Sequence, residues 1–406
     1  MYLLQFLETA PSRATAAAPE AVDIEYRLAC SGELFNRKII TGDWRKSDIT
    51  RVLLRTPLEL FVNSQPFDAY PQELCARMTL SYVTEVATGD ISARTIRLPD
   101  EDVIEDLCSI LSLLSRRLIS PVAKTHERRS SQHHGPHAEP YGSYTLDFPV
   151  PIIPLPRFAA WNRRPLTVIT SLEGQRVVDN SPPPVGVDPD ALADFLLKLP
   201  NIPRAVEIVN ASRLYRASLE LIESRSDIAY QLLISTVESL ADVAFGDYEP
   251  DQSEKIATKL AVQQRARDFG LDEEQAKQLA LDVCKGERWL RRKFKKFILD
   301  FVSLDELAVK DRVFLVHESF YPPKKDILKA LGRIYDARST NLHVATPFPR
   351  HVGVGTSTSI KISQLPAFSQ PLDIPPVPWF ERVVSLAAQK FLIEKSGIAV
   401  APFLSE

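Results

Sequence analysis

The spacing of apolar residues divides the chain into two regions of different character. Segments such as "DIEYRLAC" (23–30) alternate apolar and polar positions, which predicts half-buried strands. The stretch "RMTLSYVTEVATGDISARTIRL" (77–98) predicts a hairpin with a turn at "ATGD". Apolar residues then recur at helical spacing from Val103 to Leu114, which predicts a helix that begins at Asp100 or Glu101. Residues 1–185 are therefore expected to form a mixed, strand-containing domain.

A proline-rich stretch, "NSPPPVGVDPD" (180–190), is typical of a boundary, and the pattern changes after it. Asp188 is expected to cap a short helix, with Pro189 in its first turn. Two long amphipathic helices follow over about 201–224 and 226–246, then a helical insertion over about 250–322. Two more helices are predicted, one containing "KKDILKALGRIYDARSTNLHVAT" and one containing "PPVPWFERVVSLAAQKFLIEK". The fold class expected is α+β, with an N-terminal α+β domain at 1–185 and an all-α domain at 186–406.

Composition narrows the functional classes. At 406 residues, two or three domains are expected. The formal net charge of −3 argues against a protein that coats nucleic acid non-specifically, although a local basic patch is allowed. The four cysteines are scattered without a CxxC pair, which favours buried reduced thiols in a cytoplasmic protein. The first 22 residues lack a basic segment before their apolar run, and no window of about 18 apolar residues exists, so neither a signal peptide nor a membrane span is expected.

The stretch "YDARSTNLH" (335–343) is unusually polar for a helix whose preceding turns carry Ile327, Leu331 and Ile334. At about 100° per residue, Arg338 and His343 lie about 140° apart on a regular helix. Arg338 shares a face with Asn341, whereas His343 shares one with Asp336 and Ser339. Spacing alone is compatible with an ordinary structural network of hydrogen bonds, because buried polar groups require partners.

The same residues carry a resemblance to a known family. "IYDARSTNLH" resembles the R-x4-6-H motif of the HEPN superfamily, and in particular the Apea-like HEPN group, whose motif helix reads as an aromatic residue, a gap, "RS", a gap and a histidine. Tyr335, Arg338, Ser339 and His343 match these positions. Glu238, in the second long helix, fits the acidic position of the family's pattern. The resemblance covers about residues 188–400 and implies a four-helix bundle, interrupted here by the helical insertion.

The resemblance implies a metal-independent endoribonuclease that needs no cofactor and acts as a homodimer on RNA. His343 would serve as general base or acid, and Arg338 would stabilise charge on the phosphate. Ser339 and Asn341 would orient these groups, with Tyr335, Asp336 and Glu238 in support. Because two protomers of this family commonly pair with their motif helices facing, Arg338 of one chain could work beside His343 of the other. The family's usual setting implies a role in bacterial anti-phage or stress defence.

The alternative left open is a non-catalytic HEPN domain used for dimerisation, nucleotide binding or protein interaction.

The segment "KGERWLRRKFKKF" (285–297) is a second candidate, since basic side chains bind phosphate and aromatic rings stack on bases. The RNA-binding candidates in it are Arg288, Arg291, Arg292, Lys295 and Lys296. Trp289, Phe294 and Phe297 fall at helical spacing with other apolar residues, so they are expected to anchor the core, and a solvated basic face is the plainer interpretation. A histidine-rich loop (His126, His133, His134 and His137) has no convincing metal-ligand spacing, and no metal site is predicted.

Overall fold

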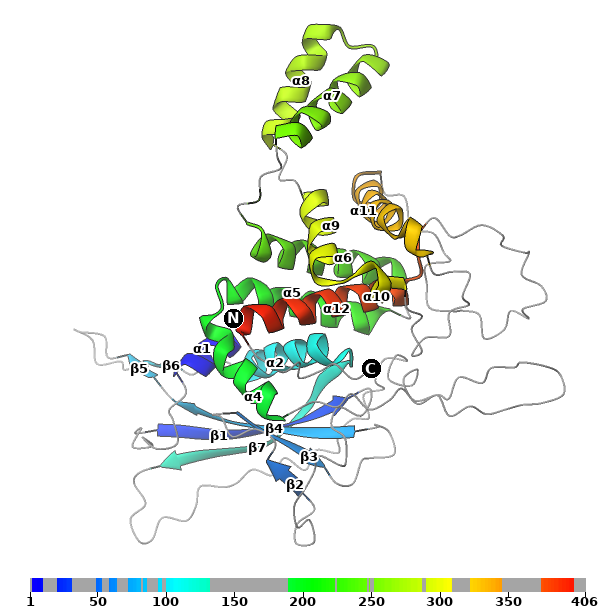
Figure 1. The fold of residues 1–406 in the computed structure, drawn as a ribbon. Coiled ribbons are helices and arrows are strands. Elements are labelled where there is room, and N and C mark those ends of the chain that lie inside the picture. The colour runs from blue at the N-terminus through cyan, green and yellow to red at the C-terminus, as the bar shows by residue number, and fades with distance from the viewer. Residues whose placement is uncertain are drawn as a thin grey trace, which may run out of the picture.

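The computed structural model describes residues 2–9, 20–30, 49–52, 58–63, 72–81, 83–85, 94–96, 100–131, 189–222, 225–246, 248, 252–286, 290–308, 322–344 and 374–397. These residues form an α+β structure in which an antiparallel sheet lies on one side of stacked helices (Figure 1).

The sheet has five strands in the order β2-β3-β4-β1-β7. The strands are β1 (Glu20–Cys30), β2 (Ile49–Val52), β3 (Leu58–Asn63), β4 (Gln72–Ser81) and β7 (Ile119–Ser131). The prediction of a loop at His126 was wrong, because His126 lies in β7 opposite Glu25 of β1; β7 is an edge strand, and its polar residues hide the strand from a reading of apolar alternation. In β1, Ile24, Tyr26 and Leu28 are buried at alternate positions, as the sequence pattern predicts. Ile24 pairs with Met78 and Leu28 pairs with Leu74 of β4, so one apolar face continues across the strands. The predicted hairpin is present as β5 (Val83–Glu85) paired with β6 (Arg94–Ile96).

Helix α2 (Asp100–Ser115) lies between the sheet and the later helices, and residues on all of its sides are buried. It packs against β7 on one side and against α5 (Ala205–Leu221) and α12 (Val377–Ser396) on the other (Figure 1). Two short helices, α1 (Tyr2–Thr9) and α4 (Pro189–Lys198), flank this layer, and α4 continues into the 3₁₀ turn η2 (Leu199–Asn201). The helix predicted after Asp188 therefore begins at Pro189, as expected.

Helices α5 and α6 (Ser226–Ala244) are the two long helices that the sequence predicts, and they pack closely together. Beyond them lie α9 (Leu290–Phe301), α10 (Leu304–Ala308), the 3₁₀ turn η4 (Lys324–Asp326) and α11 (Ile327–Val344), which holds the polar motif. The helices α7 (Gln252–Asp268) and α8 (Glu273–Gly286) form a hairpin that projects away from the rest of the molecule (Figure 1). Helix α9 belongs to the core, because Phe294, Phe297 and Ile298 are fully buried.

Most of the buried apolar residues in the described ranges form one cluster that runs from α1 and the sheet through α2 to α12. Polar contacts also join residues from before and after the proline-rich stretch, since Arg213 of α5 binds the buried carboxylate of Asp106 on α2 at 2.5 Å. Helices from both sides of the proline-rich stretch thus share a core, and the domain boundary at residue 185 stays a prediction. Cys30 and Cys108 are buried, as expected, and form no disulfide among the described residues, whereas the side chains of Cys75 and Cys284 lie outside the description.

Candidate functional site around Arg338 of helix α11

Arg338 lies at the point where the apolar face of α11 becomes polar. Ile327, Leu331 and Ile334 are fully buried, and Arg338 follows Ile334 by one turn, so its side chain continues along the core-facing side. There its Nη2 donates a hydrogen bond to Oε2 of Glu238 on α6 at 2.8 Å. The contact joins residues 100 positions apart. It places the acidic residue that the family resemblance singled out directly against the motif arginine.

The pair is poorly exposed to water. The Arg338 side chain is 23% exposed and the Glu238 side chain 13%. Burial raises the pKa of the Glu238 carboxyl, and the charge of Arg338 and the neighbouring Tyr335 hydroxyl offset only part of this effect. The buried Oε1 of Glu238 has no hydrogen-bond partner in the described part of the chain. A carboxylate in this setting interacts strongly with the nearby guanidinium.

Tyr335 completes the surroundings of Arg338. The Arg338 guanidinium lies 5.9 Å from the centroid of the Tyr335 ring, and that ring packs against Phe294 of α9 at 5.4 Å. Burial, followed by the charge of Glu238, raises the pKa of Tyr335, so the phenol stays protonated near neutral pH. The guanidinium is therefore held between a carboxylate and an aromatic ring, which limits its orientations.

Arg338 has donors that the described residues do not use. A guanidinium has five N–H donors, and one is used in a hydrogen bond to the residues that the structure describes. An arginine with spare donors and partial exposure can bind an anion such as a phosphate.

The other motif residues are placed only through the helix backbone. Helix α11 continues to Val344, but the side chains of Ser339, Asn341 and His343 lie outside the description. By helical spacing, position 343 falls on the face that carries Asp336, away from the face of Arg338. Asp336 itself accepts a hydrogen bond from Nη2 of Arg291 on α9 at 2.8 Å. Joint action of Arg338 and His343 stays a prediction.

The predicted basic segment is helix α9, and most of its described charges have partners within the protein. Arg291 binds Asp336, and Nη2 of Arg292 donates to the Thr258 hydroxyl at 2.6 Å. Lys296 pairs with Asp300 at 2.6 Å and lies 5.0 Å from the Phe245 ring centroid. Arg288 and Trp289 lie outside the described residues. Phe294 and Phe297 are buried, which confirms that they anchor the core.

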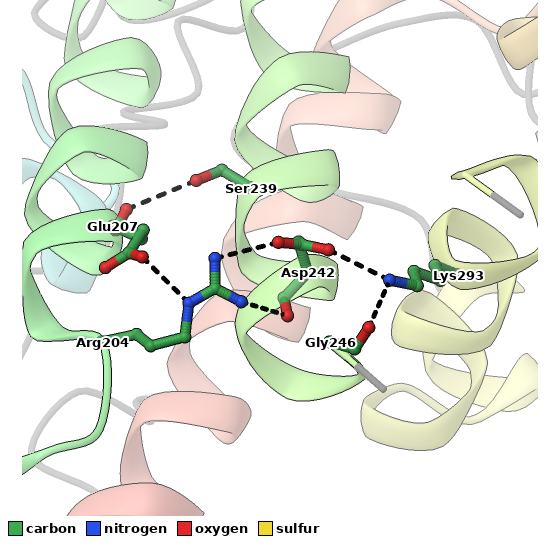
Figure 2. Close-up of polar contacts among 6 residues, drawn as sticks. All are labelled: Arg204, Glu207, Ser239, Asp242, Gly246 and Lys293. Carbon is green, nitrogen blue, oxygen red and sulfur yellow. Dashed lines mark hydrogen bonds and ion pairs between the residues drawn. The ribbon is translucent and has the colours of Figure 1, made fainter. Parts of the chain in front are cut away.

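A second polar network, which the sequence patterns did not single out, joins α5, α6 and α9 (Figure 2). Arg204 precedes α5 with a left-handed backbone (φ 60°) and binds both the side chain and the carbonyl oxygen of Asp242. The Lys293 ammonium, whose side chain is 7% exposed, donates to Asp242 at 3.0 Å and to the Gly246 carbonyl at 3.1 Å. Burial opposes ionisation, but hydrogen bonds from Lys293 and Arg204 lower the pKa of Asp242.

Helical spacing offers a signal for this network. Lys293 precedes the buried Phe297 by four residues, and Asp242 follows Glu238 by four. Arg204 and Lys293 both lie at the carboxyl end of α6, where their positive charges compensate the negative end of the helix dipole. The network fixes α6 against α9 and thereby supports the turn of α6 that presents Glu238.

Comparisons with protein-family models, with curated proteins and with solved structures found no match to this chain. None of the helices in the described ranges has the length and hydropathy of a membrane-spanning helix. In those same ranges, no three histidine, cysteine, aspartate or glutamate side chains gather as a set of metal ligands.

Proposed function

We propose that the chain is a HEPN-type, metal-independent endoribonuclease that acts as a homodimer. In this proposal α5, α6, α11 and α12 correspond to the helices of the family's bundle. The observation that supports it best is the contact between Arg338 of the motif helix and Glu238 of the second long helix. The donors of Arg338 that no described residue uses, and its partial exposure, add support, because the chemistry requires a cation that can reach a phosphate.

The proposed reaction is attack of a ribose 2′-hydroxyl on the adjacent phosphate. The attack breaks the bond to the 5′-oxygen and leaves a 2′,3′-cyclic phosphate. His343 accepts the 2′-hydroxyl proton or returns one to the leaving oxygen, since imidazole titrates near neutral pH. Arg338 stabilises the charge that develops on the phosphate oxygens. Because positions 338 and 343 lie on different faces of one helix, each site takes Arg338 from one protomer and His343 from the other.

The first experiment measures cleavage of mixed cellular RNA in EDTA by the wild type, Arg338→Ala and His343→Ala. Lys329→Ala is the matched control, because it removes an exposed positive charge from the same helix. We expect cleavage by the wild type and the control and none by the two motif variants. Wild-type cleavage that persists in both motif variants would exclude the proposed site.

Mixing the two inactive variants tests the composite site. A heterodimer of Arg338→Ala and His343→Ala holds one site with both residues intact and one with neither. With random exchange of protomers, about a quarter of the wild-type activity should return. If both residues act within one chain, the mixture stays inactive.

A cytoplasmic role in bacterial anti-phage defence follows from the same resemblance and is proposed with it. Expression of the wild type should slow growth or reduce phage plating, and His343→Ala should abolish the effect.

The second candidate function is a non-catalytic dimerisation, nucleotide-binding or interaction module. It is favoured by the hydrogen bond of Arg338 to the poorly exposed Glu238, which a purely structural arginine would also show. This alternative predicts a dimer that is harmless in cells and leaves RNA intact, and in which Arg338→Ala lowers the melting temperature.

A further inference from the structure

The cationic groups of Lys295 and Arg291 lie together over Gly332 of the motif helix. A Cβ atom added at Gly332 would meet Nζ of Lys295 at 3.0 Å and Nη2 of Arg291 at 3.3 Å. The absence of a side chain at this position is therefore what allows the two groups to rest against the backbone of α11. Two positive charges in one place repel each other unless a negative group joins them.

Asp336 supplies only part of the required negative charge. It pairs with Arg291 at 2.8 Å, and its side chain is 56% exposed, so water weakens the pair. Lys295 is half-buried and has no hydrogen-bond or ion-pair partner among the described residues. Burial and the neighbouring Arg291 lower the pKa of Lys295, while Asp336 acts in the opposite sense.

Lys295 differs in this respect from the other described basic residues of α9. Arg291, Arg292, Lys293 and Lys296 all have partners in the described ranges. A lysine that gives up hydration without a protein partner has donors to offer to an incoming anion.

We infer that Lys295 and Arg291, seated on Gly332, bind a backbone phosphate of single-stranded RNA. The inference rests on the proposed function for the identity of the ligand. The face of α11 that carries Gly332 and Asp336 also carries position 343 by helical spacing, about 16 Å further along the axis. A strand held at Lys295 would therefore run toward the proposed catalytic histidine, with two or three nucleotides between the two points.

The test measures binding of a fluorescein-labelled, 2′-O-methyl single-stranded RNA by fluorescence anisotropy over a range of salt concentrations. The 2′-O-methyl groups prevent cleavage, so binding is measured separately from catalysis. Lys295→Met removes the charge and keeps most of the aliphatic stem. Lys277→Ala is the control, because it removes the same charge from the projecting hairpin, where Lys277 is exposed and lies 3.7 Å from Glu273.

We expect Lys295→Met to weaken binding about tenfold, as for loss of a hydrogen bond to a charged group. The magnitude of the salt slope should fall by about 0.7, as for loss of one phosphate contact on a single strand. Asp336→Asn should tighten binding, because it removes the competing carboxylate. Lys277→Ala should match the wild type.

Three results would overturn the inference: no binding of the RNA by the wild type, binding by Lys295→Met within twofold of the wild type, or an equal loss in Lys277→Ala. Binding of inorganic phosphate that depends on Lys295, without binding of RNA, would overturn the assignment to RNA. If Lys295→Met fails to fold, Lys295→Arg and Lys295→Gln replace it. Lys295→Arg keeps the positive charge and should retain RNA binding, whereas Lys295→Gln removes the charge and should lose it.

Cleavage assays distinguish this inference from the proposed function. If RNA binds through Lys295 but is not cut, the endoribonuclease proposal fails and the phosphate site stands. If cleavage requires Arg338 and His343 but is unchanged in Lys295→Met, the phosphate site fails and the endoribonuclease proposal stands.

Discussion

Arg116 connects the end of α2 to the last helix, and its removal should destabilise the whole chain. The Arg116 guanidinium binds Glu381 of α12 through two hydrogen bonds, at 3.2 Å and 2.6 Å, and Tyr215 of α5 donates to the same carboxylate. The Glu381 side chain is 3% exposed and that of Arg116 is 21% exposed. Arg116→Ala therefore leaves a buried carboxylate with the Tyr215 hydroxyl but without its cation.

Breaking a buried pair from one side costs about 3–5 kcal/mol. Because water reaches part of Arg116 and Tyr215 remains, we expect about 3 kcal/mol for Arg116→Ala. Arg116 also has a left-handed backbone (φ 54°), so Arg116→Gly should be less destabilising than Arg116→Ala by about 1 kcal/mol. In the double variant Arg116→Ala/Glu381→Gln, the loss should be smaller than the sum of the single losses, since no buried charge is left uncompensated.

The assay is urea unfolding of the full chain followed by tryptophan fluorescence, because Trp379 lies buried close to Glu381 in sequence. Lys198→Ala is the control, since it breaks an exposed pair with Asp194 and should cost about 0.3–0.5 kcal/mol. If Arg116→Ala and Lys198→Ala lowered the free energy of unfolding equally, burial would not be what gives the Glu381 pair its effect.

Three further predictions concern other parts of the structure. A hydrogen bond from Lys390 lowers the pKa of Glu306 from 4.5 to about 2, so the contribution of Glu306 to stability is complete above pH 4.5 and disappears as the pH falls toward 2. Glu306→Gln should therefore flatten the dependence of the melting temperature on pH between these values, and an unchanged slope would contradict the prediction. Gly332→Ala should raise the free energy of unfolding by up to about 1 kcal/mol, because alanine favours the helix and the flexible ends of the Lys295 and Arg291 side chains can move away from the added methyl group. A lower free energy of unfolding in urea would show that these two side chains cannot move away. Phe380→Ala removes a buried ring stacked on Tyr230 at 5.0 Å and should lower the free energy of unfolding by about 3–5 kcal/mol. Phe269→Ala, at a residue that is 84% exposed, should lower it by under about 0.5 kcal/mol, and equal losses in urea unfolding would refute the packing argument.

Much of the secondary structure could be predicted from local spacing. The alternation in β1 follows the period of two that a half-buried strand imposes, and Ile24, Tyr26 and Leu28 are buried accordingly. The apolar residues of α2 and the start of α4 at Pro189 followed from helical spacing and capping rules in the same way. The aromatic residues of α9 could likewise be assigned to the core, because Phe294 and Phe297 continue an apolar stripe.

The burial of α2 on all sides could not be predicted, because it depends on how α5 and α12 cover the helix. The fate of the basic residues of α9 was also beyond the pattern. Four of them looked equivalent as RNA-binding candidates, yet Arg291 pairs with Asp336 of α11, while Lys295 lies over Gly332 and has no ion-pair partner among the described residues. The positions of Arg291 and Lys295 depend on the direction in which α9 crosses α11, whose contacting residues are some 40 positions away in the sequence. The pair of Lys296 with Asp300, four residues on in the same helix, is by contrast a local contact that helical spacing allows.

The amino-acid sequence by itself determined most of the helices and strands, the motif of Arg338 and His343, and the change of pattern after the proline-rich stretch, since all of these depend on neighbours within a few residues. It did not determine the short helix α1 or the polar edge strand β7. Only the tertiary structure decided that Arg338 meets Glu238 and that Arg116 meets Glu381, 265 positions away. Contacts of this kind arise from the packing of whole helices, and the free energy that selects one packing is distributed over the entire apolar core.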